Sequence, residues 1–205
     1  MKVRFIAIAG GSGSGKTWLS QRVAQRLGDR AAVLSLDDFY RDRSHLTPSE
    51  RRHVNFDHPR ALDWSGFIAA VSKLKQGKET RIPIYDFTVS SRSGTHRRMN
   101  PAPLILVDGL WPLQAPGASD LYSLSIFVDA TPSERLARRI ERDRKERART
   151  VASIQREFRS HVEPMHQRFV EPQREAADVV IASPMPGSRV ARLVQRLERL
   201  LPPTE

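Results

Sequence analysis

An eight-residue stretch near the start of the chain has the residue types and spacing of a triphosphate-binding loop. It fits the pattern G-x-x-x-x-G-K-[ST] at every specified position. Glycines let backbone N–H groups turn toward phosphate oxygens, Lys16 can reach the β and γ phosphates, and the Thr17 hydroxyl can ligate Mg²⁺. The stretch therefore predicts a site for ATP, or another nucleoside triphosphate, together with Mg²⁺. Its residues are Gly10, Gly11, Ser12, Gly13, Ser14, Gly15, Lys16 and Thr17.

Carboxylates occur at two further places where a triphosphate site needs them. Asp37 and Asp38 follow the apolar stretch 31–36, and Asp108 follows the apolar stretch 104–107. The carboxyl ends of parallel strands face the ligand side of an open α/β sheet. Asp108 is therefore predicted to reach the metal shell, as the strand-borne carboxylate that completes a phosphate-loop site. For the pair Asp37 and Asp38, the capping of a turn is the alternative interpretation.

The elements that must position these residues alternate between strands and helices. Apolar stretches typical of buried strands occupy residues 3–9, 31–36, 104–107, 125–129 and 178–183. Apolar residues at helical spacing occur in 19–27, 64–74, 131–147, 151–169 and 190–201. This alternation predicts an α/β fold of the P-loop NTPase type, with a mostly parallel sheet and helices on both of its faces.

Two prolines modify this pattern. Pro83 excludes a central strand for residues 81–87, so we expect an edge strand or hairpin arm there, as part of a small β-hairpin. The polar stretch 90–100 is then expected to be the surface tip of that hairpin. Pro164 is expected to kink or split the helix that begins at Val151.

The segment 131–147 combines many arginines with few apolar residues. Because its apolar positions are Leu136, Ala137 and Ile140, one face is expected to pack and the other to form a dense cationic surface. Acidic residues alternate with the arginines, so a solvated, salt-bridged face is one interpretation. We favour an Arg-rich helical lid that closes on ATP and brings guanidinium groups to the transferring phosphoryl group.

Length and composition bound the class of protein. The 205 residues suit one domain over 1–205, with a mobile substrate loop at 41–60, an edge hairpin at 80–100 and the lid at about 132–150. The absence of cysteine excludes disulfides and thiolate metal sites and fits a cytoplasmic protein. We expect no membrane partner, because no apolar run reaches transmembrane length. The net charge of +11 permits non-specific contact with nucleic acid.

Several strings along the chain resemble the uridine kinases (uridine-cytidine kinases) of the uridine kinase/phosphoribulokinase group. Between Val3 and Ser183 they include GGSGSGKT, DDFY, SHLTPSER, NFDHPRALD, PIYDF, LVDGL, FVDATPSERLARRIERDRKERAR and VEPMHQRFVEPQREAADVVI. The phosphate loop is shared by many families, whereas the middle and C-terminal strings are far more specific. The resemblance implies a homo-oligomeric kinase that phosphorylates the 5′-hydroxyl of a small ribose-bearing substrate, most readily uridine or cytidine.

The resemblance also implies roles for individual residues. Asp37 resembles the general base that takes the proton of the acceptor hydroxyl and also touches the metal, and Asp57 resembles the carboxylate that holds the ribose hydroxyls. The expected lining of the nucleoside pocket is aromatic: Tyr40, Phe56, Tyr85 and Phe87. The expected cations are Arg139 and Arg149 at the nucleoside, and Arg142 and Arg147 with Lys16 at the phosphates.

Four positions depart from the pattern of that family. Ser90 replaces a base-reading His, and Glu157 replaces a base-reading Gln, so both changes alter the hydrogen bonds offered to a pyrimidine. We therefore expect weak or relaxed pyrimidine discrimination with the ribose hydroxyls still required. Asp108 replaces a Glu and is expected to serve the metal still. Ala148 replaces a Gly between two lid arginines, which restricts the backbone but keeps both charges.

Two alternative functions follow from the same observations. Ser90 and Glu157 favour a kinase of the same fold that acts on another small polyol, such as a sugar phosphate or a pantothenate-like alcohol. The net charge of +11 suggests instead a P-loop NTPase switch associated with nucleic acid. This second alternative is the weaker one, and no specific nucleic acid is expected, because the cations concentrate on one segment and no RNA-binding aromatic pattern is present.

Overall fold

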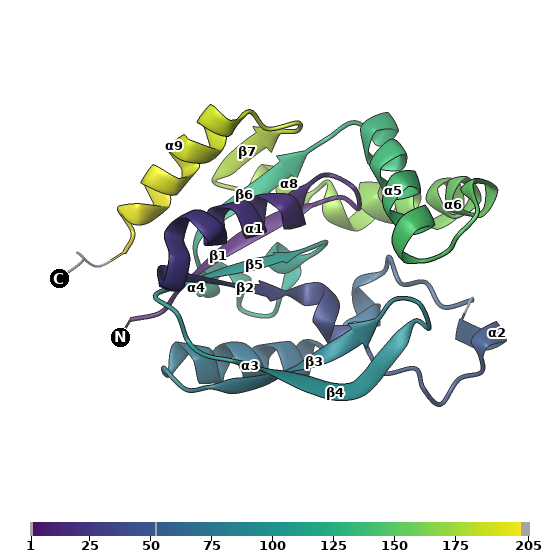
Figure 1. The fold of residues 1–205 in the computed structure, drawn as a ribbon, viewed down its shortest axis with the longest axis horizontal. Coiled ribbons are helices and arrows are strands. Elements are labelled where there is room, and N and C mark those ends of the chain that lie inside the picture. The colour runs from purple at the N-terminus through teal and green to yellow at the C-terminus, as the bar shows by residue number, and fades with distance from the viewer. Residues whose placement is uncertain (1, 52, 202–205) are drawn as a thin grey trace.

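A five-stranded parallel sheet lies at the centre of the computed structural model, which describes residues 2–51 and 53–201 (Figure 1). The spatial order of the strands is β2-β5-β1-β6-β7. Their bounds are β1 (Arg4–Gly10), β2 (Ala31–Ser35), β5 (Leu104–Gly109), β6 (Tyr122–Asp129) and β7 (Val179–Ala182). The central strand β1 therefore delivers the glycine loop to the middle of the carboxyl edge, and the predicted parallel sheet is confirmed.

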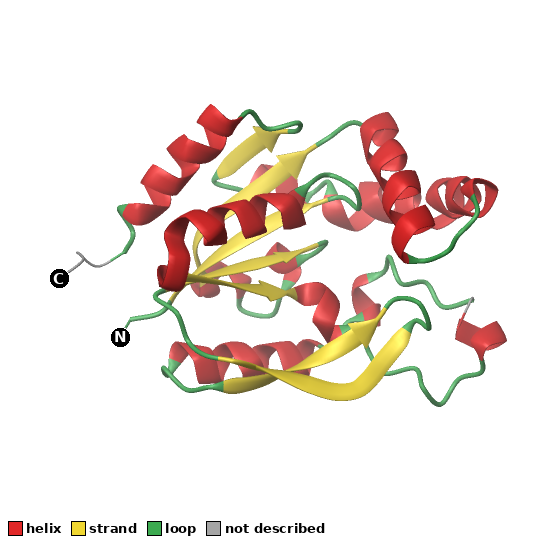
Figure 2. Ribbon diagram, in the orientation of Figure 1, coloured by secondary structure: helices red, strands yellow, loops and turns green. Residues whose placement is uncertain are grey.

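Helices cover both faces of this sheet (Figure 2). On one face, α1 (Lys16–Leu27) packs beside α9 (Gly187–Glu198), as the periodicity predicts. On the other face lies α3 (Trp64–Lys75), which begins after Asp63, whose carboxylate accepts a hydrogen bond from the Gly66 N–H at 3.0 Å. The cap satisfies one of the N–H groups that the first turn leaves without a helical partner.

Alternate residues of β1 face two separate hydrophobic cores. Ile6 and Ile8 pack with α1 and α9, whereas Phe5 and Ala9 pack with the cluster that contains Phe67 of α3. All four β1 side chains are at most 1% exposed. A strand buried on both faces explains why the sequence shows a continuous apolar run there instead of alternation.

The hairpin differs from its predicted form. β3 (Thr80–Asp86) pairs antiparallel with β4 (Ser91–Met99) in a separate two-stranded sheet. The expectation that residues 90–100 form a hairpin tip is wrong, because most of them form β4 and the turn lies at 87–90. Polar residues are tolerated in β4 because most of its side chains are exposed, while Arg92 and Arg97 form ion pairs with Asp63 and Asp38.

The helical segment around Pro164 also differs from expectation. The chain continues through α6 (Val151–Glu157), a π-helical stretch (Phe158–Val162), α7 (Glu163–Met165) and a second π-helical stretch (His166–Val170) without leaving helical geometry. Pro164 lies in the first turn of α7, where its missing N–H and fixed φ are tolerated. The wider π turns therefore replace the predicted kink or split.

Short elements complete the chain. They are the 3₁₀ turns Gly28–Arg30, Leu36–Phe39, Pro59–Ala61 and Pro112–Gln114, and the helices α2 (Pro48–Arg51), α4 (Ala118–Leu121) and α8 (Gln173–Ala176). The lid helix α5 (Pro132–Glu146) is longer, with 15 residues. Figure 1 shows α5 and α6 beyond the arrowheads of the strands, at the end of the sheet where the glycine loop lies. Within residues 2–51 and 53–201, no helix has both the length and the apolar character that a membrane crossing requires.

Candidate active site

The glycine loop connects β1 to α1 and is packed closely against the lid helix. Gly13 and Gly15 have φ of 80° and 98°, in the left-handed region that glycine favours. A Cβ on Gly13 would overlap the backbone oxygen of Arg135 in α5, and one on Gly11 would lie 2.8 Å from Nδ1 of His166. The glycines are thus needed both for loop conformation and for the approach of α5 and the second π-helical stretch.

A Gly13→Ala variant tests this packing. The added methyl group would meet rigid backbone at Arg135 in a conformation that alanine rarely adopts. We expect the affinity for ATP to fall roughly tenfold, since left-handed strain and displacement of the loop together cost on the order of 1–3 kcal/mol. Gly117→Ala is a control, because Gly117 also has positive φ but its Cβ would meet open space. Isothermal titration measures the affinity of both proteins for ATP. If Gly117→Ala binds ATP as weakly as Gly13→Ala does, the close packing of Gly13 against Arg135 is not the cause.

Lys16 lies near enough to the two carboxylates that the sequence assigns to the metal for their charges to affect it. Its side chain is 8% exposed, and burial lowers its pKa, while the nearby charges of Asp37 and Asp108 act to raise it. Asp108 is also buried, and burial raises the pKa of its carboxyl group. The β2–β5 register brings Asp108 opposite Ser35, beside the start of the turn that carries Asp37. The structure thus brings together a cation and two carboxylates that are distant in the sequence.

A metal ion fits this arrangement. The Ser20 hydroxyl donates to Oδ2 of Asp108 at 3.0 Å, whereas the buried Oδ1 has no hydrogen-bond partner among the described residues. The described part of the chain holds no group of three or more His, Cys, Asp or Glu residues suited to a metal. Mg²⁺ commonly binds through one or two carboxylates, phosphates and water, so a site formed by Thr17, Asp108 and Asp37 needs no such group.

The two members of the Asp37–Asp38 pair have different surroundings. Asp38 accepts a hydrogen bond at 2.9 Å from Nη2 of Arg97 in β4, and this contact ties it to the hairpin. Burial is the main cause that raises the pKa of Asp57 and of Tyr40, and the charge of Asp37 acts in the same direction on both groups. Asp37 is therefore the member of the pair that is electrostatically linked to the phosphate loop and to the neighbouring cavity.

That cavity has a volume of about 910 Å³ and collects most of the predicted nucleoside residues. Its aromatic wall contains Tyr40, Phe56, Tyr85 and Phe87, with ring centroids 5.0–6.3 Å apart in the contacting pairs. Among its polar residues are Asp57, Ser90, Arg149 and Glu157. Arg147, expected at the phosphates, also lines the cavity and lies 4.3 Å from the centroid of the Phe87 ring, whereas Arg139, expected at the nucleoside, is not among the lining residues. Burial raises the pKa of the Asp57 carboxyl, and the charge of Arg139 opposes this effect. An aromatic slot with a half-buried carboxylate can hold a flat base and a polyol.

The face of α5 that packs inward is charged rather than apolar. Arg135, Arg139 and Asp143 are buried, whereas Leu136 and Ile140 are only half-buried and Ala137 is exposed. The expectation that the apolar positions form the packed face is therefore wrong. The buried arginines are tolerated because they are paired: Arg135 meets Glu163 at 2.5 Å and lies over the Phe158 ring.

The lid arginines are drawn together around two carboxylates. Asp143 lies within 3.6 Å of four guanidinium groups, and Glu157 pairs with Arg139 at 2.8 Å and also with Arg149. Arg139 further donates to the Ser12 hydroxyl at 2.9 Å, so the lid contacts the phosphate loop directly. The carboxylate of Glu157 lines the cavity while engaged in both ion pairs.

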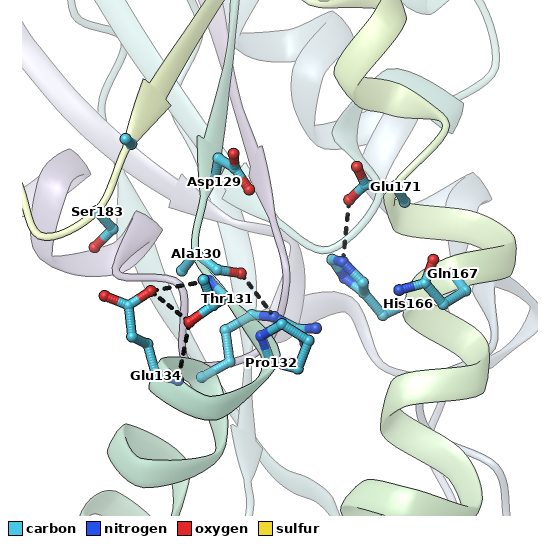
Figure 3. Close-up of a pocket in the computed structure, with 11 residues that line it drawn as sticks. Asp129, Ala130, Thr131, Pro132, Glu134, His166, Gln167, Glu171 and Ser183 are labelled. Carbon is cyan, nitrogen blue, oxygen red and sulfur yellow. Dashed lines mark hydrogen bonds and ion pairs between the residues drawn. The ribbon is translucent and has the colours of Figure 1, made fainter.

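Other residues around the loop were not identified from the sequence. Arg138 donates to the carbonyl oxygens of Gly13 and Ser14, at 3.2 Å each, and to the Ser183 hydroxyl. His166 contacts Glu171 through Nε2 at 3.2 Å and lines a second cavity of about 370 Å³ beside Thr131 and Ser183 (Figure 3). Charged residues recur every four positions along the buried face of α5, but this spacing alone does not distinguish a buried face from a solvated one.

Two of the departures from the family pattern have unusual backbone conformations. Ser90 and Ala148 have φ of 54° and 49°, the left-handed region that is costly for residues with a Cβ. Ala148 occupies the position between Arg147 and Arg149 where the family usually has glycine. The backbone at Ala148 therefore has the left-handed conformation that glycine favours, although the residue is alanine.

Comparison with known proteins places these observations in context. A model of the phosphoribulokinase/uridine kinase family matches residues 5–190. The uridine kinase of Chlamydia pneumoniae is 38% identical over 182 residues, which cover 88% of this chain and 82% of that protein. The uridine kinase of Geobacillus kaustophilus is 41% identical over 177 residues, which cover 86% of this chain and 84% of that protein. Phosphoribulokinase from Rhodobacter spheroides shares the fold, with a TM-score of 0.62 and 17% identity over 88% of this chain and 70% of that one.

Proposed function

Because this chain belongs to the phosphoribulokinase/uridine kinase family, we propose that it transfers the γ-phosphoryl group of ATP to the 5′-hydroxyl of uridine or cytidine. The observation that carries the proposal is the aromatic cavity, which contains Asp57 and two lid arginines and lies beside the phosphate loop. A polyol kinase needs no such aromatic slot for a base. The uridine kinase relatives, which match along most of their length, favour neither the polyol alternative nor the NTPase switch.

In this proposal the residues divide the chemistry between them. Asp37 accepts the proton of the 5′-hydroxyl. The hydroxyl oxygen forms a bond to the γ-phosphorus while the bond between the γ-phosphorus and the bridging oxygen breaks, which releases ADP. Lys16, Arg142 and Arg147 stabilise the charge that spreads over the transferring group. A Mg²⁺ ion held by Thr17, Asp108 and Asp37 would neutralise phosphate charge when bound. Asp57 holds the ribose hydroxyls, and the aromatic wall with Arg149 holds the nucleoside. Arg139 acts at the nucleoside from outside the cavity lining, through its ion pair with Glu157.

A panel of acceptors tests this function. With ATP and Mg²⁺, we expect ADP release with uridine and cytidine and none with sugar phosphates or pantothenate-like alcohols. The 2′-deoxy analogues should have kcat/KM values lower by roughly tenfold or more, because the half-buried Asp57 carboxylate would lose one hydrogen-bond partner, at a cost of about 1–3 kcal/mol. Turnover with a sugar phosphate but with no nucleoside would overturn the proposal. A salt-sensitive shift of labelled RNA without nucleoside turnover would favour the NTPase switch.

Base discrimination makes a separate prediction. Ser90 lines the cavity and lacks the reach of the family's histidine, while Glu157 is engaged by Arg139 and Arg149. We therefore expect weak discrimination between pyrimidines. Ser90→His together with Glu157→Gln should raise kcat/KM for uridine about tenfold, and Ser90→His alone separates the base contact from the loss of the two ion pairs. A wild-type enzyme that is already selective, and that the changes do not improve, would contradict this interpretation.

The cellular setting completes the proposal. ATP and Mg²⁺ are the expected donor and cofactor, and the absence of cysteine suits a cytoplasmic enzyme. A homo-oligomer follows from the family resemblance, and analytical ultracentrifugation would measure it.

A further inference from the structure

A single buried carboxylate lies among the lid arginines. The Asp143 side chain is 0% exposed, and Arg142 meets its Oδ1 at 2.8 Å. The remaining contacts are longer: 3.6 Å from Arg147 to Oδ1, and 3.5 and 3.6 Å from Arg139 and Arg149 to Oδ2. The backbone oxygen of Asp143 also accepts hydrogen bonds from the N–H groups of Arg147 and Arg149 at 3.2 Å each. One residue therefore contacts four of the seven arginines of the lid, Arg139, Arg142, Arg147 and Arg149, and holds the end of α5.

The Asp143 carboxylate itself occupies few of the guanidinium donors. Of these four arginines, Arg142 alone donates a hydrogen bond to the Asp143 carboxylate, and Oδ2 has no hydrogen-bond partner in the described residues. Arg139 and Arg149 hydrogen-bond instead to Glu157, and Arg147 lies over the Phe87 ring. Arg142 and Arg147 are 33% and 18% exposed, so both retain donors for a ligand. Asp143 can thus fix where the arginines lie without occupying the groups that would bind phosphate.

The local charge balance requires such an anion. Four guanidinium groups gather in a partly buried space, and their mutual repulsion would separate them unless anions lie between them. Two carboxylates serve this cluster, but Glu157 pairs only with Arg139 and Arg149. Asp143 is the carboxylate in contact with Arg142 and Arg147, the two arginines assigned to the phosphates.

We propose that Asp143 is a positioning residue, a built-in counter-ion that holds the four lid arginines in their working arrangement before ATP binds. This inference rests on the proposed function, since it assigns Arg142 and Arg147 to the transferring phosphoryl group. Asp143 itself touches no substrate. Arginines placed in advance stabilise the transition state without the cost of reorganising during the reaction. The negative charge of Asp143 also weakens the binding of simple polyanions to the arginines. Anions other than the ATP phosphates therefore occupy the lid less readily.

Asp143→Asn tests the charge with little change of volume. We expect kcat with ATP and uridine to fall roughly tenfold to a hundredfold, because misplaced catalytic groups cost about that much. Inorganic tripolyphosphate should bind roughly tenfold more tightly at low salt, because one opposing charge has been removed. Glu141→Gln is the matched control: Glu141 lies on the same helix in an exposed pair with Lys145, and both quantities should stay unchanged.

Asp143→Glu separates position from charge. It keeps the negative charge but moves it by one methylene group, so tripolyphosphate affinity should stay at the wild-type value while kcat falls severalfold. A Glu variant with wild-type kcat overturns the proposal, as does an Asn variant that loses kcat and tripolyphosphate affinity together. If the Asn variant does not fold, the Glu variant decides. A wild-type enzyme that is inactive on nucleosides would contradict the proposed function. Because tripolyphosphate binding needs no nucleoside, the binding results would still test whether Asp143 acts as a counter-ion.

Discussion

Replacing Lys16 with alanine is expected to lower kcat by roughly a thousandfold or more while the protein stays folded. The Lys16 side chain lies in the glycine loop beside Asp37 and Asp108, outside both hydrophobic cores. Its ammonium group would meet the β and γ phosphates, and no other lysine belongs to the loop. Its loss therefore removes charge stabilisation from the reacting phosphates without removing core packing.

Activity and thermal unfolding of the same preparations measure this result. Lys145→Ala is the control, because Lys145 carries the same charge on the exposed side of the lid, where it pairs with Glu141. The control should retain wild-type kcat. Substantial turnover by a folded Lys16→Ala enzyme would show that the glycine loop does not hold the reacting phosphates.

The second large effect is expected at Asp37. If Asp37 is the general base, Asp37→Asn should lower kcat by roughly a hundredfold or more with little change in the KM for the nucleoside. Asp38→Asn is the matched control, since Asp38 is an adjacent carboxylate engaged by Arg97. Steady-state kinetics with uridine measure both variants. A near-normal Asp37→Asn enzyme beside an inactive Asp38→Asn enzyme would assign the base to the other carboxylate.

Asp57 offers a contrast within the same experiment. Its carboxylate lines the cavity rather than the phosphate loop, so Asp57→Asn should raise the KM for the nucleoside as well as lower kcat. If Asp57→Asn lowers kcat and leaves the KM for the nucleoside unchanged, Asp57 acts on the reacting atoms and not on the ribose.

The triphosphate loop and its flanking elements could be predicted from local sequence. A run that is apolar at every position, such as residues 5–9, is typical of a strand buried on both faces, and the structure buries all five residues. Glycines at fixed spacing before a helical pattern then determine the loop. Carboxylates that follow apolar runs, such as Asp37 and Asp108, could be assigned to the carboxyl edge because parallel strands all end there. These features depend on neighbours within a few residues, so they are readable without the fold.

Other features of the site depend on contacts between distant segments. The inward face of α5 carries Arg135, Arg139 and Asp143, and in a sequence such a face is indistinguishable from a solvated one. Apolar periodicity reveals a buried face only where the partner is apolar, whereas here the partners are Glu157 and Glu163, from the helical segment that follows the lid. Likewise β4 carries no apolar pattern, because most of its side chains face outward and its partner strand determines its conformation. Tertiary structure alone decided these features, since burial of a charge depends on the counter-charge that folding brings to it.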